Sequence, residues 1–540
     1  MKLVLCWRTG RYFKPKQIYY RLYYALRRRL RRLRAYQYRY FVEKEGTDLV
    51  LRERMLPVGL CSVSRGTFTF LNISHRFDGP IDWNVMEYGL LWNYHLNSFE
   101  YLGQRDVSFQ QGLKWMNEFI DSFKNNRRGS DPYPLSRRLV NWVKFIAYHK
   151  GRFTGRTLRI IDAFLYAQAL ILLDNIEYHL MANHLLENGF ALLFAAYYFH
   201  DQRLYRKAVK ILSGELGEQI LSDGGHFERS PMYHQLVLHR ILDAINLVKH
   251  KPIFGEELLN LLTGKALSML DWLRHMTFGN GNISLFNDSA HGIAYSSREL
   301  NDYARRLGLP GKRSRRPLPL GESGYRRVNG LHYEIIIDVG DLGPDYNPGH
   351  GHCDTFSFEL YAYGKPVVVD TGLSTYDDVL QRTKERMTAA HNTVRVGDVE
   401  QSEIWGKFRV GRRAHVRNLK EGDGFLEAEH TGYVHIGAAL RRRFLFTDDG
   451  VTIHDRVNSK KRYDCDAYLH FYPGLEPSIA SDSILLPSSH LTIKVKNFHA
   501  MSLQSGHYSA GFNRLIPNKV LVIDFCSGED LEIAIRVAGG

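Results

Sequence analysis

Cysteine is sparse in this chain of 540 residues. The five cysteines are odd in number and widely spaced, which argues against a disulfide framework and against a cysteine-rich zinc module. Long apolar runs are also missing. The longest strongly apolar stretch, residues 190–199, is far shorter than the ~20 residues that a membrane-spanning helix needs. The sequence therefore predicts no transmembrane helix.

An export signal is not evident either. The first six residues are partly apolar, but Trp7, Arg8 and Arg11 interrupt them before the apolar core of a signal peptide can form. We therefore expect a cytoplasmic or membrane-peripheral protein, with the periplasm as the alternative. The sequence also lacks a Walker A motif, a Rossmann glycine fingerprint, an HExxH motif and a GxSxG motif in a supporting context.

Positive charge is concentrated at the start of the chain. The net charge is +15, and residues 1–50 hold fourteen Lys or Arg against three acids, a net +11. Only +4 is left for all later residues together. The basic character therefore belongs to one segment and does not by itself show that the rest of the chain binds a polyanion.

Residues 14–40 of this segment read as a basic amphipathic helix. Leu22, Leu26, Leu30 and Leu33 recur at helical spacing with arginines between them. Three interpretations stay open: a solvated helix docked on the rest of the protein, a helix docked on an anionic membrane, and a polyanion-binding helix. No recognition motif accompanies the charge, so we expect no nucleic-acid partner.

The remaining chain divides into a helical part and a β-rich part. Apolar residues at helical spacing, separated by short Gly, Asp, Ser or Pro turns, predict a helical bundle or an α/α toroid over residues 51–307. Residues 308–330, rich in Pro and Arg, form a predicted linker. Short β-branched and aromatic runs over residues 331–540 predict an antiparallel sandwich or layered sheet. Helices followed by strands indicate that the chain after the basic segment 1–50 is a segregated α+β protein.

Polar residues interrupt an apolar helix predicted over residues 176–199. Asn183 and Glu187 share one helix face, and His184 and Asn188 share another, because each pair is four residues apart. Their apolar surroundings imply burial, where every polar group needs a partner. The residues form either a satisfied buried network or the polar wall of a cleft.

A glycine-rich turn at residues 223–225 leads into a second helix, whose first turn carries Tyr233 and His234. Functional groups often lie at such loop-to-helix junctions. A tyrosine at the start of a helix is also common for structural reasons. The residues alone leave both interpretations open.

A third group of polar residues lies in the β-rich part. His350 and His352 would point to one face if they lay on a strand, and Asp370 and His391 follow them. Histidine and aspartate are compatible with zinc. The spacing is not diagnostic, so a metal site and a hydrogen-bonded histidine network are both consistent with it.

Together these segments resemble the heparinase II/III family of polysaccharide lyases. The similarity covers most of the chain from about residue 70, and the motifs occur in the same order. The resemblance implies an incomplete α/α toroid followed by an antiparallel β-sandwich, and β-elimination at a uronic acid of an acidic polysaccharide. The basic start and the missing export signal resemble members associated with bacterial surface polysaccharides. Further matching motifs lie at residues 81–84, 91–94, 132–134, 285–289 and 368–370.

The resemblance also implies roles for individual residues. Tyr233 matches the general base and acid, and Asn183 matches the amide that binds the uronate carboxylate. His184 matches a neighbouring position in the cleft, where it could act as the base for a uronic acid with the opposite configuration at C5. His350 matches a catalytic histidine that reaches in from the β-domain. Glu187 is a weaker candidate to share a proton with the substrate carboxylate.

A zinc ion is the implied cofactor. His352, Asp370 and His391 match a zinc site in the β-domain, which we interpret as structural, and no fourth protein ligand is evident. Arg382 and Arg386 precede His391 and are predicted either to bind substrate anions or to be ordinary surface charges.

Other functions remain consistent with the sequence. A uronate C5-epimerase needs the same proton abstraction without loss of the leaving group. A glycoside hydrolase needs two facing carboxylates, and would leave Tyr233 and Asn183 without a role. A non-catalytic polysaccharide-binding or assembly protein is a further alternative. Heparan-sulfate-like, alginate-like and bacterial exopolysaccharide substrates are not distinguished, and neither is the oligomeric state.

Overall fold

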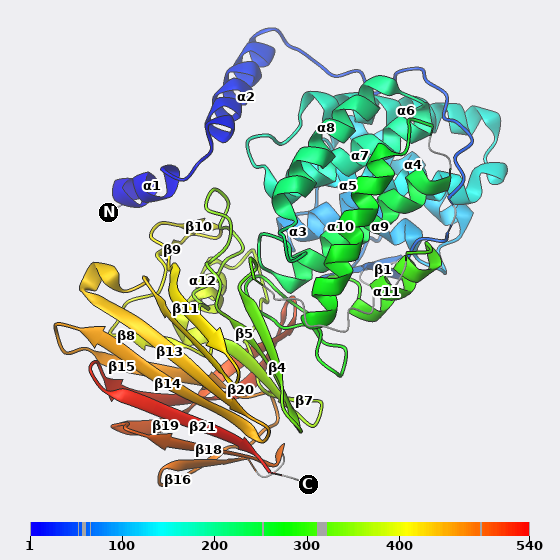
Figure 1. Ribbon diagram of the computed structural model, residues 1–540. Helices are drawn as coiled ribbons and strands as arrows, with labels where there is room; N and C mark the ends of the chain where they lie inside the picture. Colours follow the sequence, from blue (N-terminus) through cyan, green and yellow to red (C-terminus); the bar gives the residue numbers. More distant parts are fainter. Residues whose placement is uncertain are drawn as a thin grey trace.

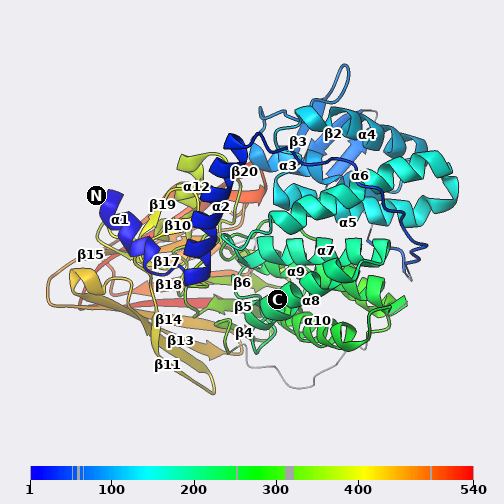
Figure 2. The same cartoon turned by 90° about the horizontal axis from the view of Figure 1, so that it is seen from above.

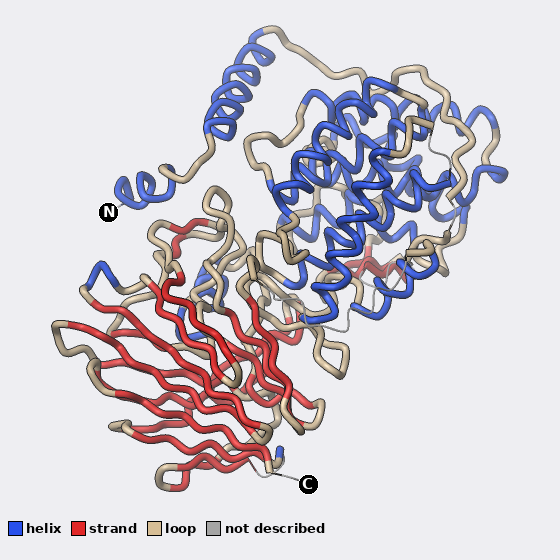
Figure 3. The backbone as a smooth tube through the Cα atoms, in the orientation of Figure 1, coloured by secondary structure: helices blue, strands red, loops and turns tan. Residues whose placement is uncertain are grey.

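The computed structural model describes residues 2–51, 53–56, 61–64, 66–250, 253–309, 321–486 and 489–538. Within them, most helices precede the large sheets along the chain, and helices and sheets occupy separate parts of the molecule (Figure 1, Figure 3). The predicted segregated α+β class is therefore confirmed. Much of the predicted linker, residues 310–320, lies outside the described residues.

The helical domain is built from neighbouring helices joined by short loops, in the arrangement of an incomplete α/α toroid (Figure 2). At its centre, α7 (Ala182–Phe199) packs against α5 (Pro132–His149) and α8 (Gln202–Gln219). Most residues of α7 are buried, in agreement with its apolar residues on all sides. Other long helices of this domain are α3 (Leu90–Ser98), α4 (Phe109–Ser122), α6 (Gly155–Asp174), α9 (Pro231–His250), α10 (Glu257–His275) and α11 (Ser297–Arg306).

Side-chain caps set where several of these helices begin. Ser108, Thr154 and Asp201 accept backbone N–H bonds at the starts of α4, α6 and α8. Ser296 and Glu299 form a reciprocal capping box at the start of α11. These caps satisfy donors that a helix leaves unpaired in its first turn, so the local sequence defines the helix starts.

A small antiparallel sheet precedes the toroid helices and was not predicted. It consists of β1 (Cys61–Ser64), β2 (Thr67–Phe70) and β3 (Ile73–Arg76). Phe68 and Phe70 lie on one face of β2 and pack on aromatic residues of the toroid. The alternation of Thr and Phe in β2 is the pattern of a half-buried strand.

The β-domain holds three larger antiparallel sheets. The first has the order β4-β5-β6-β7: β4 (Tyr325–Asn329), β5 (Tyr333–Asp338), β6 (Phe358–Ala362) and β7 (Lys365–Val368). The second has the order β11-β12-β13-β14-β21-β18-β17-β16, and the third β19-β20-β15-β8. Their strands are β8 (Val394–Val396), β11 (Val416–Gly422), β12 (Phe425–His430), β13 (Ala438–Thr447), β14 (Gly450–Ser459), β15 (Asp464–His470), β16 (Ser478–Ala480), β17 (Ser483–Leu486), β18 (Leu491–Lys496), β19 (Ala500–Gly511), β20 (Arg514–Cys526) and β21 (Asp530–Val537).

The sheets share one apolar core, as the predicted sandwich requires. Ile533 and Ile535 of β21 belong to the same buried cluster as Ile523 and Phe525 of β20. Buried and partly exposed residues alternate along β12 and β21, which is the pattern of strands with one buried face.

The end of α10 and the segment after it pack on the first sheet of the β-domain. Trp272 is fully buried there, and its Nε1 donates to Ser323 Oγ at 3.0 Å. Phe278 stacks on Tyr361 of β6 with ring centroids 3.7 Å apart. This apolar contact holds the toroid and the β-domain together beside the site described below.

The basic start of the chain forms two helices that lie over the junction of the domains, α1 (Lys2–Gly10) and α2 (Pro15–Leu33) (Figure 1, Figure 2). In α1, Arg8 pairs with Glu403 of the β-domain at 2.6 Å. In α2, Arg31 pairs with Asp174 of the toroid at 2.7 Å. None of the described helices combines the length and the apolarity needed to cross a bilayer.

The contact between the domains can be tested at Trp272. Trp272→Ala should lower the free energy of unfolding by ~3–5 kcal/mol, because it leaves a cavity in a closely packed apolar cluster. Urea unfolding measures this change. Leu331→Ala is the matched control: Leu331 is 71% exposed, so its replacement should have a small effect. Equal losses in the two variants would contradict the prediction.

Candidate active site

A pocket of about 670 Å³ opens where the toroid, the β-domain and the N-terminal segment meet. All four residues predicted to be catalytic line it, although they come from distant parts of the sequence. The toroid contributes Asn183, His184 and Tyr233, and the β-domain contributes His350. Other lining residues include Thr9, Phe13, Gln17, Arg21, Tyr94, Tyr133, Tyr346, Tyr376, Trp405, Lys407 and Phe408.

Tyr233 lies in the first turn of α9. Ser230 Oγ accepts the backbone N–H of Tyr233 at 3.1 Å, and Pro231 occupies the first helical position, so the local sequence starts the helix here. The Tyr233 hydroxyl lies 3.1 Å from the Tyr376 hydroxyl, and its ring centroid lies 4.2 Å from that of His350.

The environment of Tyr233 disfavours the phenolate. Burial raises the pKa of Tyr233 well above 10, and the carboxylates of Asp288 and Glu228 raise it further. The hydroxyl of Tyr376 acts in the opposite direction but is outweighed. The resting side chain is therefore a phenol.

Asn183 and His184 lie in the first turn of α7. The two residues before Asn183, Met181 and Ala182, have φ values of 63° and 51°. A positive φ is uncommon for residues with a side chain, so the backbone is held in an unfavourable conformation directly before Asn183. No side-chain hydrogen bond of Asn183 is found within the described residues, so its amide is available to a ligand in the pocket.

His184 favours its charged form. Burial alone would lower its pKa, but the carboxylate of Glu177, with Oε1 3.0 Å from His184 Nδ1, gives a net increase. The same carboxylate accepts from Asn188 Nδ2 at 3.0 Å, and Asn188 also donates to Ser136. The polar residues of α7 therefore divide: Asn188 belongs to a satisfied buried network, whereas Asn183 and His184 form a pocket wall.

Asp288 connects the toroid side of the site to the β-domain. It follows α10 in the chain, is fully buried, and its Oδ2 lies 2.6 Å from His350 Nδ1. Its Oδ1 lies 2.8 Å from His352 Nε2, and Arg382 contacts both of its oxygens. Burial alone would raise the pKa of Asp288, but the Arg382 guanidinium and the histidine hydrogen bonds hold it well below its usual range.

His350 and His352 occupy a loop between β5 and β6, not a strand. Both nevertheless reach Asp288, and the loop that carries them is folded closely on itself. A Cβ on Gly351 would lie 2.5 Å from the backbone oxygen of Leu342, so a residue with a side chain would displace the loop.

The comparisons with known proteins agree with this architecture. Residues 135–307 match the family model "Heparinase II/III N-terminus", and residues 312–536 match "Heparinase II/III-like, C-terminal". The chain belongs to the heparinase II/III family.

Two curated relatives of this family member are heparin-sulfate lyases. The protein from Bacteroides stercoris is 24% identical over 322 residues, which are 53% of this chain and 45% of the relative. The protein from Pedobacter heparinus is 26% identical over 218 residues, 36% of this chain and 32% of the relative. The chain therefore aligns with less than half the length of these relatives.

Solved structures support the fold of the family member. A crystal structure of heparinase III gives a TM-score of 0.68 at 17% identity, covering 86% of this chain and 80% of that chain. A heparan sulfate lyase HepC mutant from Pedobacter heparinus gives 0.61 at 16% identity, covering 86% and 80%. At these identities the likeness establishes the toroid and β-sandwich architecture alone.

Arg382 and Arg386 do not line the pocket of this heparinase II/III protein. Both are fully buried, so they are not surface charges, and neither is among the residues that line the pocket. Arg382 binds Asp288, and Arg386 donates to the Gly351 carbonyl oxygen from Nε at 3.1 Å and from NH2 at 2.8 Å. Because both contacts hold the loop that carries His350, the two arginines are positioning residues.

Two glutamates lie behind the pocket wall. Glu187 accepts from Arg240 Nε at 2.9 Å and borders a separate cavity of about 30 Å³ that Asn183 and Tyr233 also line. Glu228 is buried, its Oε2 lies 3.9 Å from His350 Nε2, and burial raises its pKa. Glu187 thus lies near the predicted site without lining the main pocket.

Sequence reasoning assigned no role to Asp288 or Tyr376, and considered Glu228 only as a carboxylate of the glycoside-hydrolase alternative. Asp288 and Glu228 belong to motifs that carried the family resemblance. An acidic residue inside such a motif could have been recognised as a candidate site residue. No comparable signal marks Tyr376, which lies on the segment between β7 and α12 (Val379–Arg386).

The predicted zinc ligands His352, Asp370 and His391 are buried close together. His391 Nδ1 lies 2.8 Å from Asp370 Oδ2, and the rings of His391 and His352 have centroids 5.3 Å apart. Among the described residues, His352 Nδ1 and His391 Nε2 are buried without a hydrogen-bond partner. Two such imidazole nitrogens are donors of the kind that zinc takes, but within the described residues the ligand atoms of His352, Asp370 and His391 do not all lie within 4.8 Å of one another.

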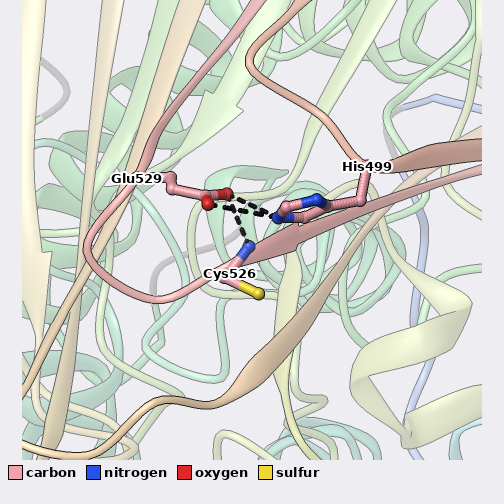
Figure 4. A group of neighbouring side chains, drawn as sticks. All are labelled: His499, Cys526 and Glu529. Carbon is pink, nitrogen blue, oxygen red and sulfur yellow. Dashed lines mark hydrogen bonds and ion pairs between the residues drawn. The ribbon is translucent and has the colours of Figure 1, made fainter.

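A different group already has its ligand atoms within 4.8 Å of one another: His499, Cys526 and Glu529 (Figure 4). Glu529 pairs with His499 and accepts the backbone N–H of Cys526 at 3.0 Å. Arg462 donates to the Cys526 sulfur from NH2 at 3.1 Å and from Nε at 3.3 Å. A cation at this sulfur would face the guanidinium charge, so this group is a poor metal site.

Asp288→Asn should destabilise the protein strongly. The change leaves the buried Arg382 without its counter-charge, and breaking a buried ion pair costs ~3–5 kcal/mol. Urea unfolding measures the loss. Asp302→Asn is the control, because Asp302 pairs with an exposed Arg305 and surface pairs contribute at most about 1 kcal/mol. Comparable losses in the two variants would show that Asp288 does not hold the site together.

Proposed function

We propose that this heparinase II/III family protein is a polysaccharide lyase that cleaves a uronic-acid-containing polysaccharide by β-elimination. The observation that carries the proposal is the apposition of Tyr233 and His350, 4.2 Å apart ring to ring, in the pocket that Asn183 and His184 also line. The names of the heparin-sulfate lyase relatives support it. Alginate-like and bacterial exopolysaccharide substrates contain the same reacting unit and belong in the test.

The reaction removes a weakly acidic proton from the carbon next to a carboxylate. An enzyme must therefore neutralise that carboxylate and stabilise the negative charge that develops on it. The Asn183 amide and the cationic form of His184 supply a hydrogen-bond donor and a positive charge at one wall of the pocket. Both residues line the same pocket, so both can act on one carboxylate.

Tyr233 is the proposed proton-transfer group. As a resting phenol it is suited to protonate the leaving oxygen. To take the C5 proton it must first lose its own, and the imidazole of His350, whose ring lies beside it, is the neighbouring group that can receive it, while the Tyr376 hydroxyl can donate a hydrogen bond to the resulting phenolate. One tyrosine can act as base and then as acid when the proton and the leaving oxygen lie on the same face of the sugar.

His352 and His391 are the residues that would bind a zinc ion directly, and Asp370 would support them by holding His391. Bound there, zinc would cross-link the segments that carry these residues and would place a positive charge among buried carboxylates. Asp370 orients His391 through the bond to Nδ1, which leaves Nε2 for a metal. Because His352 also bonds Asp288, this cluster is connected to the residue that holds His350.

Tyr233→Phe tests the catalytic role. The change removes the hydroxyl and keeps the ring, so kcat should fall by at least ~10²–10⁴-fold with the fold intact. The assay follows the unsaturated uronate product on a panel of heparan-sulfate-like, alginate-like and bacterial exopolysaccharide substrates. Tyr148→Phe is the control, because this tyrosine lies outside the pocket and is partly exposed.

Two outcomes would contradict the proposal. Near-normal elimination by the Phe variant would remove Tyr233 from the reaction and direct attention to His184 or His350. Solvent deuterium at C5 without chain cleavage would identify the enzyme as a uronate C5-epimerase.

The zinc proposal is tested by metal analysis and thermal unfolding. His391→Ala should lower both the zinc content and the Tm, because metal binding is coupled to folding. His499→Ala, in the group that is a poor metal site, should change neither. Purified wild-type protein without zinc after refolding in its presence would refute the site.

A further inference from the structure

The helix α2 has two opposite faces, and only one of them contacts the protein. Tyr24 is buried and its hydroxyl donates to the Ile176 carbonyl oxygen at 2.5 Å. Arg27 NH2 donates to Asn175 Oδ1 at 2.7 Å, and Arg31 NH1 lies 2.7 Å from Asp174 Oδ2. The protein-facing side of α2 is therefore made of tyrosine and arginine, not of leucine.

The leucines of α2 point away from the protein. Leu22, Leu26, Leu30 and Leu33, the outer leucine face, are 68%, 59%, 45% and 83% exposed. At about 100° per residue they fall within an arc of roughly 80°, opposite to Tyr24. The neighbouring helix α1 adds exposed apolar residues: Leu3, Val4 and Trp7. Aligned apolar residues on an outward face mark an interaction surface rather than scattered exposure.

The charge beside the outer leucine face identifies its partner. Arg29 and Arg32 are exposed on one flank of the leucine arc, Arg34 is exposed at the end of the helix, and no acidic residue occurs in residues 1–42. A polyanion alone would account for the arginines and would leave the leucines uncovered. An anionic bilayer accounts for both, since leucines enter the headgroup and acyl boundary while arginines bind lipid phosphates.

We propose that α2 docks this protein on an anionic membrane surface through the outer leucine face. The helix lies in the plane of the membrane rather than across it, in agreement with the finding that no described helix can span a bilayer. The other side of the same N-terminal segment lines the pocket through Thr9, Phe13, Gln17 and Arg21. Docking surface and pocket wall are thus opposite sides of one segment.

Sedimentation with lipid vesicles tests the proposal independently of any enzymatic activity. The full-length protein should bind phosphatidylcholine vesicles that contain phosphatidylglycerol, bind pure phosphatidylcholine vesicles much less, and lose affinity at high salt. The double variant Leu22→Ser with Leu26→Ser should bind the anionic vesicles at least about tenfold more weakly. Its Tm should match that of the wild type, because both side chains are exposed.

The matched control is Leu331→Ser with Leu485→Ser, which replaces two exposed leucines of the β-domain, 71% and 42% exposed. This control should bind anionic vesicles like the wild type. Equal binding by both double variants would overturn the proposal, and so would failure of the wild type to bind. A second copy of the chain is the other partner that could cover this face, and sedimentation velocity tests for it. If the wild type is a dimer and the Leu22→Ser, Leu26→Ser variant is a monomer, the face binds a second copy of the chain instead.

Discussion

A single buried carboxylate, that of Asp288, is the constraint on which the site depends. It lies on a segment that follows the toroid helix α10, while its partners His350, His352 and Arg382 all belong to the β-domain. A carboxylate removed from water is tolerated only when its charge and lone pairs are satisfied. This ionic cluster therefore joins the two domains at the site and places the His350 ring beside Tyr233. The apolar contact around Trp272 also holds the two domains together, but it does not fix the orientation of any side chain in the pocket.

Much of the fold could be predicted because its signals are local. Helical spacing before residue 307 and short β-branched runs after residue 331 separate the two parts of the chain. Asn183, Tyr233 and His350 stood out because polar residues in apolar elements need a reason to be there. Their meeting in one pocket followed from the family resemblance, since no local rule relates residues 167 positions apart.

The predictions that changed involve partners distant in sequence. Arg382 was expected at a substrate or at the surface, because an arginine is rarely buried unless its charge is paired. Its partner Asp288 lies 94 residues away in the sequence, and the residues near Arg382 give no indication of this pairing. The leucine repeat of α2 predicted an amphipathic helix correctly but not which face meets the protein. That choice depends on Asp174, Asn175 and the Ile176 carbonyl oxygen at the far end of α6.

The two attachments of the N-terminal segment have a mechanical consequence. Two bodies joined only along one interface can still hinge about it, which would open or narrow any cleft between them. Here α1 is fixed to the β-domain through Arg8 and Glu403, while α2 is fixed to the toroid through Arg31 and Asp174. The segment therefore spans the pocket and contacts the domains on both sides of it. Any change in the width of the pocket would therefore also have to change the contacts of this segment with one of the two domains.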